Sequence, residues 1–494
     1  MASIRKLDAD AGGMLFFGMH SRLPCTLTRR GLLITSFALG AIAMSLQAQQ
    51  AKPDFDAAHK EAVQILQGFI RVDTSNPPGN ETKGAVYLKE ILDKEGIASE
   101  IFELEKGRGN IVARIKGNGK KKPLLLMGHL DVVGVEREKW TVDPFGGLIK
   151  DGYIYGRGAS DDKGMTAICL EVFLTLHRLK IPLDRDVIFL SEAGEEGTTH
   201  AGIDFMVAKH WDKIECEYAL NEGGRIHEVN GKVDYVGIAT TEKVPRTTLL
   251  SAKGTSGHGS RPRTDNAIVH LAAAVAKVGN WQPPMRLNET TRQFFTRLAT
   301  IGTPEEAFLF THIEDKSMSA MVQEKIRVSY GTYNSMLRTS VVPTIMKGGF
   351  RSNVIPGDAL ATLDVRMLPD EDPDKFYEMM RKLIDDPTVE VIPPAGKVRP
   401  ANPPSRLDTE MYHALERAQK KTFPDAIAIP MMLTGATDSA QLRAKGVQAY
   451  GVGTVTGDRE ISGVHGNDER VSIAGLRKFL EFLWGATVEV AEAK

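Results

Sequence analysis

The sequence predicts an α/β domain that is interrupted by a second, α+β domain. Strand-like apolar runs alternate with helix-like segments from residue 54 to residue 220, which is typical of a sheet layered between helices. The pattern changes near residue 244, where Gly-rich turns and an alanine-rich helix precede a new group of strands. We therefore expect a first domain over 49–243 and 399–494, with an inserted domain over 244–398.

The helices are predicted by apolar residues that recur at helical spacing. Ala62, Leu66 and Phe69 share one face of the first helix, over 54–72, and Gly96 ends the second. The same pattern predicts helices over the ranges 86–96, 165–176, 266–278, 410–421 and 471–488.

The strands are predicted by short apolar runs between turn residues. In the first domain these runs span 98–104, 110–115, 124–133, 187–190 and 218–220. Residues 236–250 alternate between apolar and polar, and the later strands of the inserted domain span 341–345, 359–365 and 389–392.

Composition excludes several classes of protein. Hydrophobic residues make up 42% and charged residues 25% of the chain, as in ordinary globular proteins. The formal net charge of -1 gives no reason to expect a nucleic-acid partner. Cys25, Cys169 and Cys216 are too few and too far apart for a disulfide framework or a thiolate metal site.

The N-terminal segment has the layout of an export signal. Arg29 and Arg30 directly precede an apolar run over 31–46, and small and polar residues follow it. The paired arginines resemble a twin-arginine signal, so we expect residues 1–48 to be cleaved and the protein to be periplasmic or secreted. The alternative is an N-terminal membrane anchor, for which the apolar run is short. After cleavage we expect no stable membrane anchor.

The strand over 124–133 ends in a histidine and an aspartate. Residues two apart in a strand point to the same side, so His129 and Asp131 can touch. A carboxylate that holds one imidazole nitrogen leaves the other free for a metal. Alternatively, the two side chains could bond only to each other and bind no metal.

Further acidic residues follow later strands and loops. Asp161 lies before a predicted helix, Glu195 and Glu196 follow the strand over 187–190, and Glu222 follows the strand over 218–220. Aspartate is also a preferred helix cap, and paired glutamates are commonly solvated. Sites in open α/β sheets form at the carboxyl ends of strands, so we interpret this convergence as a candidate site.

Five motifs in order resemble the M20 metallopeptidase family, which includes aminoacylases, carboxypeptidases, desuccinylases and dipeptidases. They are GHLDVV (128–133), GRGASDDKG (156–164), EAGEEG (192–197), NEGG (221–224) and VHGNDE (464–469). The resemblance implies a zinc-exopeptidase-like catalytic domain, with a mixed sheet flanked by helices, and an inserted α+β lid or dimerisation domain.

The resemblance also implies a site for two zinc ions. His129 and Glu222 would bind one ion, Glu196 and His465 the other, and Asp161 would bridge them. Nitrogen and oxygen ligands suit catalytic zinc, and they also accept cobalt or manganese.

Other residues of the motifs would assist the metal site. By resemblance, Asp131 would orient His129, Glu195 would be the general base, and Asp162 would be structural. Residue 194 is glycine where many members of the family have aspartate.

The inserted domain holds three further candidates by the same resemblance. His258, in GTSGHGSRP, would reach the active site of a partner subunit in a homodimer formed through the lid. Asn353 and Arg366 would bind the substrate carboxylate, a task that suits the guanidinium fork. The alternatives are an exposed turn histidine for His258 and an ordinary strand-end ion pair for Arg366.

The function implied is hydrolysis of an amide bond next to a free carboxylate. Water activated by the metals would attack, with Glu195 as its base. The substrate would be an N-acyl-amino acid or a short peptide cut at its C-terminal residue. A dipeptidase, which would also recognise a free substrate amine, is the alternative. A catalytically inert metal-binding or peptide-binding protein is a further one, although the intact ligand set argues against it.

Overall fold

The computed structural model describes residues 52–396 and 398–493. The export signal predicted over 1–48 lies outside the described residues, so it stays a prediction. Within the described ranges, no helix has the length and apolar character needed to cross a membrane.

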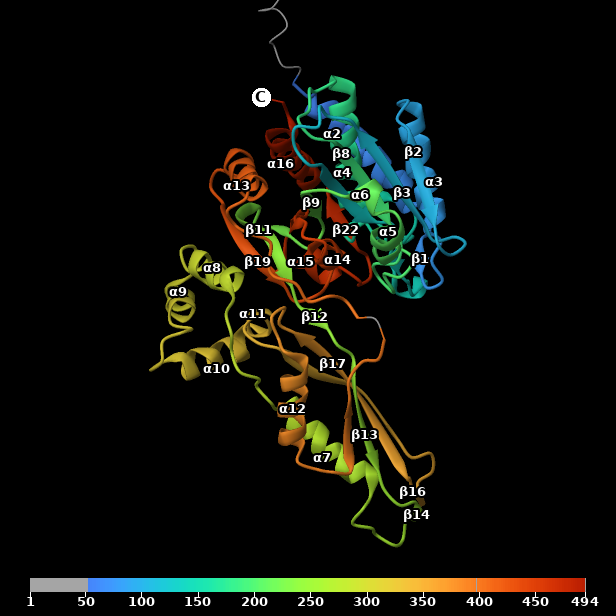
Figure 1. Ribbon diagram of the computed structural model, residues 1–494, viewed down its shortest axis with the longest axis vertical. Coiled ribbons are helices and arrows are strands. Elements are labelled where there is room, and N and C mark those ends of the chain that lie inside the picture. The colour runs from blue at the N-terminus through green and yellow to red at the C-terminus, as the bar shows by residue number, and fades with distance from the viewer. Residues whose placement is uncertain (1–51, 397, 494) are drawn as a thin grey trace, which may run out of the picture. The chain divides into compact units, whose positions relative to one another are not determined.

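A large mixed sheet forms the centre of the first domain (Figure 1). Strand β4 (Leu124–His129) is parallel to both of its neighbours, β8 (Val187–Glu192) and β9 (Tyr218–Asn221). Every residue of β4 is buried, as expected for a strand with both faces covered. The other strands are β2 (Ser99–Glu103), β3 (Gly109–Ile115), β10 (Arg225–Val229), β11 (Lys232–Glu242), β19 (Ile427–Leu433), β20 (Gln448–Gly451) and β21 (Val455–Thr456).

Helices cover both faces of this sheet. Leu124 and Leu126 of β4 belong to one apolar core, whereas Leu125 and Met127 belong to another, as the alternation of a strand requires. The first core includes α2 (Phe55–Ile70), α3 (Glu81–Lys94), α4 (Lys163–Leu179), α13 (Glu410–Thr422) and α16 (Ile473–Ala491). The second includes α5 (Ile203–Lys209), α6 (Trp211–Ile214) and α14 (Ser439–Ala444).

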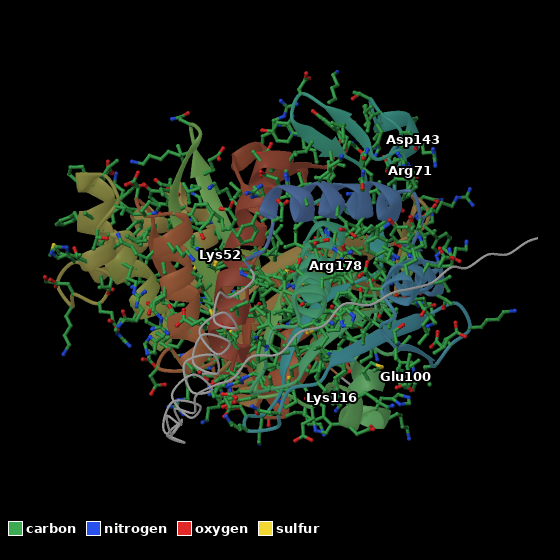
Figure 2. All side chains as sticks on the ribbon, turned by 90° about the horizontal axis from the view of Figure 1, so that it is seen from above. Lys52, Arg71, Glu100, Lys116, Asp143 and Arg178 are labelled. Carbon is green, nitrogen blue, oxygen red and sulfur yellow. The ribbon has the colours of Figure 1, made fainter. Side chains whose placement is uncertain are left out.

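Helix α4 is tied to its neighbours by a charged cluster. Arg178, labelled in Figure 2, donates hydrogen bonds of 2.7 Å to both Glu61 of α2 and Glu95 of the α3 C-terminus. Beneath it, Glu171 is fully buried in α4. The cluster therefore joins three helices of the first core.

The inserted stretch contains a smaller sheet covered by helices. In β17 (Asp358–Met367), buried and partly exposed residues alternate, so one face is packed. The packing helices are α7 (Ala267–Gly279) and α12 (Pro373–Ile384). The remaining strands are β12 (Val244–Pro245), β13 (Thr248–Lys253), β15 (Ser340–Gly348) and β18 (Val389–Ile392), with a separate pair of β14 (Gly257–His258) and β16 (Val354–Ile355).

Four helices within the inserted stretch pack elsewhere. They are α8 (Glu289–Leu298), α9 (Pro304–Thr311), α10 (Ser319–Ser329) and α11 (Gly331–Met336). Their apolar residues share a core with Tyr235 of β11 and with Ile429 and Met432 of β19. The stretch 244–398 thus contributes to two separate cores, while its limits as a domain stay a prediction.

The remaining short elements lie in the connections and include strands that contact ligand-bearing loops. They are β1 (Ser75–Asn76), β5 (Val132–Val133), η1 (Arg137–Lys139), β6 (Leu148–Lys150), β7 (Tyr153–Tyr155), α15 (Asp458–Gly463) and β22 (Arg470–Ser472).

Several predicted elements differ from the structure in their limits, and the run over 236–250 is divided among β11, β12 and β13. The helix expected over 86–96 begins at Glu81, because the ion pair between Glu81 and Arg108 buries a first turn that has no apolar periodicity. The strand expected over 124–133 ends at His129, and Val132 and Val133 instead pair with β1. Strand β19 and helix α12 are among the elements that were not predicted.

Candidate metal centre

His129, the last residue of β4, is buried at the centre of the site. Its Nε2 lies 3.0 Å from Oδ1 of Asp161, and its Nδ1 lies 2.9 Å from the backbone oxygen of Asp131. The backbone contact fixes the ring, so Nε2 is the nitrogen that faces the acidic residues.

Asp161 lies between the two predicted histidine ligands. Its Oδ1 faces His129, and its Oδ2 lies 3.2 Å from Nε2 of His465. A carboxylate that directs one oxygen to each histidine has the geometry of a bridge between two cations. The structure thus brings together three residues that are far apart in the sequence.

Glu196 and Glu222 complete the group of predicted ligands. His465 Nε2 lies 2.9 Å from Oε1 of Glu196. Ligand atoms of His129, Glu195 and Glu222 lie within 4.8 Å of one another, and those of His129, Asp161 and Glu196 do so as well. Five predicted ligands and the predicted base therefore lie in one cluster.

Asp131 differs in its contacts from what the sequence suggested. Its carboxylate lies 3.6 Å from His129 Nδ1, farther than its own backbone oxygen. The carboxylate instead accepts hydrogen bonds from the backbone nitrogens of Glu195, at 3.0 Å, and Glu196, at 3.1 Å, and from Asn76. Because the strand ends at His129, the alternation of a strand does not extend to Asp131. Asp131 therefore holds the loop of Glu195 and Glu196.

Glu469 joins the two loops that contain Asp161 and His465. Its carboxylate accepts hydrogen bonds from the backbone nitrogens of Ser160, at 2.8 Å, and Asp161, at 3.0 Å. It also forms an ion pair with Arg157 at 2.6 Å. This residue was not predicted, although it closes the last motif.

Asp162 also contacts the site without facing it as a ligand. Its Oδ2 accepts a hydrogen bond of 3.3 Å from the backbone nitrogen of His129, and the residue is buried. This contact links the start of α4 to the end of β4.

Glu195 has a cationic neighbour that sequence reasoning did not find. Arg399 Nη2 lies 2.7 Å from Oε1 of Glu195, and its Nη1 lies 3.7 Å from the buried Asp438. Burial raises the pKa of Glu195 to about 8, and the charge of Arg399 opposes this rise. Arg399 follows the inserted stretch in an irregular segment, and no local pattern marks its contact with residue 195.

The donor set fits divalent cations. Asp161, Glu195, Glu196 and Glu222 all line one cavity, so their carboxyl groups lie close together and repel one another when charged. Burial and the neighbouring carboxylates raise the pKa of Glu222 well above its ordinary range. Divalent cations would offset this repulsion, and imidazole nitrogens with carboxylate oxygens are ligands that zinc accepts.

The three candidates of the inserted domain lie apart from this cavity, and none of them lines it. His258 is exposed, and its Nδ1 accepts a hydrogen bond of 2.8 Å from Ser260. His258 pairs with Val354 in the β14–β16 ribbon, beside Asn353. Arg366 forms an ion pair with Asp364 at 2.8 Å. Their predicted roles at the site stay predictions.

The cavity at the cluster has a volume of about 470 Å³. Beyond the acidic residues its lining is largely apolar, from β19 and from the helices α8 and α11. Such a combination of an apolar cavity and a few polar groups is usual for small-molecule sites.

Comparison with known proteins shows which family the chain resembles. Residues 125–487 match peptidase family M20/M25/M40. Human N-fatty-acyl-amino acid synthase/hydrolase PM20D1 is 28% identical over 496 residues, which cover 94% of this chain and 96% of the human protein. The probable carboxypeptidase S-like 2 of Dictyostelium discoideum is 29% identical over 374 residues, covering 74% of this chain and 70% of that protein.

A solved structure shows the same fold. The M20 family metallo-carboxypeptidase Sso-CP2 from Sulfolobus solfataricus superimposes with a TM-score of 0.64 at 22% identity, covering 87% of this chain and 99% of that one. Since the family match extends over most of the chain, the protein belongs to peptidase family M20/M25/M40 and is a metal-dependent hydrolase of amide bonds.

Proposed function

We propose that the protein hydrolyses N-acyl-amino acids at the amide bond next to the free carboxylate. The observation that supports this most is the position of Glu195, whose ligand atoms cluster with His129 and Glu222 at an apolar cavity. A general base beside cation ligands is the arrangement that amide hydrolysis by water requires.

The chain's own residues supply the proton transfers. When bound, the metal ions polarise the amide carbonyl and lower the pKa of water. Glu195 takes the proton of the attacking water and passes it to the leaving amine. Because Arg399 holds Oε1 of Glu195, the proton is transferred to Oε2. Asp131 keeps the loop in place through its two backbone hydrogen bonds.

The acyl substrate is favoured by both the cavity and a relative. The human relative is named for its action on N-fatty-acyl-amino acids. The cavity beside the ligands is lined largely by apolar side chains, which suit an acyl group better than a charged peptide amine.

A substrate comparison tests this proposal. We expect the metal-loaded protein to hydrolyse N-acyl-alanines and to leave Ala-Ala nearly untouched, as followed by release of free alanine. Hydrolysis of Ala-Ala alone would assign the protein to the dipeptidases. Glu195→Gln is expected to lower kcat about 10²–10⁴-fold while the bound metal remains. Glu138→Gln, on an exposed turn, is the matched control.

We further propose two zinc ions per chain. The two oxygens of Asp161, each directed to a different histidine, support two cations rather than one. Metal analysis of protein purified without added metal, followed by reconstitution with zinc, cobalt or manganese, identifies the ion.

We also propose a homodimer formed through the inserted domain. Exposed apolar side chains gather on α7 and β15, which contact each other, and in the turn after β15: Ile268, Val269, Ile345, Met346 and Phe350. Strand β15 pairs with β17 on one side, and no second partner strand is found for it in the described part of the chain. An exposed apolar strand edge favours pairing with a second copy. His258 of one subunit would then reach the site of the other.

Finally, we propose export to the periplasm or the outside. The paired arginines and the apolar run over 31–46 support this, as does their place before the first domain. N-terminal sequencing of the protein recovered from each compartment tests it.

A further inference from the structure

One part of the lining of the cavity at the metal cluster is apolar, and we call the space beside it the apolar limb. Its wall consists of Phe294, Tyr333 and Met336 from α8 and α11, and of Met431, Met432 and Leu433 from β19. The same cavity is lined by Glu195, Glu222 and His465. An amide bound at the acidic cluster would therefore have one of its two ends directed at the six uncharged side chains of this wall, and Arg225 lines the cavity as well.

The wall is held in place by packing on the catalytic sheet. The ring of Tyr333 packs edge-on against Phe294 and Phe295, with ring centroids 5.6 and 6.0 Å apart. The helices share their core with Tyr235, Ile429 and Met432. This wall therefore belongs to the body that holds the metal ligands, and not to the small sheet of the inserted domain.

The position of Met431, on the β19 part of the wall, requires glycine at a neighbouring position of β11. A Cβ placed on Gly237 of β11 would lie 2.6 Å from the sulfur of Met431. Glycine at this position therefore leaves the space that the thioether occupies. Methionine adapts to ligands of varied shape, because its side chain is flexible and polarizable.

We propose that α8, α11 and β19 bind the acyl chain of long-chain N-acyl-amino acids, so that this wall sets the chain-length preference. The inference rests on the proposed function. Arg225 also lines the cavity, but its guanidinium already donates a hydrogen bond to the hydroxyl of Tyr235 and lies over that ring. A carboxylate directed at the apolar wall would lose its hydration there, so the amino-acid end stays outside. The unbranched acyl chain is the end that can enter.

Chain length gives the first test. Burial of one methylene group corresponds to about a fourfold gain in binding. With alanine as the constant amino acid, N-acetyl, N-octanoyl and N-dodecanoyl substrates are compared below their micelle concentrations. We expect kcat/KM for N-dodecanoyl-alanine to exceed that for N-acetyl-alanine at least about 100-fold, mainly through KM.

The outcomes separate the two proposals. If no N-acyl-alanine is hydrolysed by the metal-loaded protein, the proposed function is wrong. If N-acetyl-alanine is hydrolysed as well as N-dodecanoyl-alanine, the proposed function stands and the acyl-chain wall is refuted.

Variants of the wall give the second test. Met431→Gln keeps the length of the side chain but leaves an amide facing the buried chain, so the dodecanoyl-to-acetyl ratio of kcat/KM should fall about tenfold. Thr332→Trp, at an exposed position on the same lining, adds bulk and should shift the preference to shorter chains. The control is Met321→Gln on α10, which is 48% exposed and should leave the ratio at the wild-type value.

One alternative occupant is the side chain of the amino acid. N-acetyl-alanine, N-acetyl-leucine and N-acetyl-phenylalanine are therefore measured with the same variants, whose folding is checked by circular dichroism. An effect of Met431→Gln and Thr332→Trp on this series, with the acyl series unchanged, would overturn the proposal. Unchanged ratios of kcat/KM for both variants, in the acyl series and in the amino-acid series, would also overturn it.

Discussion

Arg399 donates a hydrogen bond of 2.7 Å from Nη2 to Oε1 of Glu195, across 204 residues of sequence. Arg399 lies where the chain returns from the inserted stretch to the catalytic sheet, and its backbone oxygen accepts a hydrogen bond from Arg246 at the start of that stretch. The two segments that connect the domains are thus joined by a hydrogen bond, and one of them contacts the predicted base Glu195. Arg399 acts on the reaction by positioning Glu195.

Replacement of Arg399 by lysine should impair the base without removing it. Lysine keeps the charge but cannot hold Glu195 and face Asp438 with two nitrogens, as the guanidinium does. We expect kcat to fall about tenfold with little change in KM, measured on N-acyl-alanine. Arg406→Lys, at an exposed ion pair with Asp408, is the control. A change confined to KM would show that Arg399 contacts the substrate instead.

Removal of the charge on Asp161 should weaken metal binding. Asp161→Asn leaves no anionic bridge between His129 and His465. We expect the metal content to fall below that of the wild type, with affinity reduced more than about 100-fold for at least one ion, as measured by mass spectrometry and chelator competition. The exposed Asp143→Asn should retain the wild-type content. Full occupancy in Asp161→Asn would argue against the bridge.

Glu171 should make stability depend on pH. Burial raises its pKa to about 8 from the ordinary 4.5, with the nearby Glu61 adding to the rise. Between these values the folded protein holds a proton that the unfolded chain releases. The free energy of unfolding should therefore fall as pH rises from about 4.5 to about 8, by at most about 5 kcal/mol from this group.

The variant Glu171→Gln should remove this pH-dependent loss of stability. Glutamine can still accept the hydrogen bond from Thr175, at 3.1 Å in the wild type, without becoming charged. We expect its Tm to exceed that of the wild type at pH 9 and to approach it at pH 5, in thermal melts of metal-loaded protein. An equal difference at both values would mean that Glu171 does not titrate in this range. Glu138→Gln serves as the exposed control.

The dimer proposal predicts a charge-sensitive interface. Ile345→Lys places a cation on the exposed edge strand β15, where Ile345 is 49% exposed, and should yield monomers in light scattering. Val328→Lys, at an exposed apolar residue of α10, should leave the dimer intact. A monomeric wild type would contradict the proposal.

Mixed subunits test the role of His258. In a mixture of Glu195→Gln and His258→Ala proteins, each hybrid dimer would hold one site with both residues intact, if His258 acts across the interface. We expect the mixture to recover activity that neither variant has alone. Without recovery, despite confirmed subunit exchange, His258 does not act in trans.

The sequence was most informative where ligands follow apolar strands. His129 directly ends β4, and Glu222 directly follows β9, so local patterns could place both at one sheet edge. Family resemblance then supplied the roles. By contrast, the hydrogen bonds of Asp131 to the loop of Glu195 and Glu196 were not predicted, because the strand ends two residues before Asp131 and the position of that loop has no local signal.

Long-range packing is what the sequence could not supply. The contact of Arg399 with Glu195 has no local signal, because it depends on where an irregular segment crosses the sheet. The apolar spacing in 289–336 is compatible with packing on either domain. Only the contacts with Ile429 and Met432 decide that these helices join the catalytic sheet.

The position of Glu469 has a consequence for the biogenesis of the protein. This carboxylate, synthesised about 300 residues after Asp161, holds the backbone of the Asp161 loop through hydrogen bonds. A nascent chain that ends before residue 465 lacks both this support and His465. Metal loading must therefore follow the completion of nearly the whole chain, and a ribosome-stalled fragment would not retain the ions.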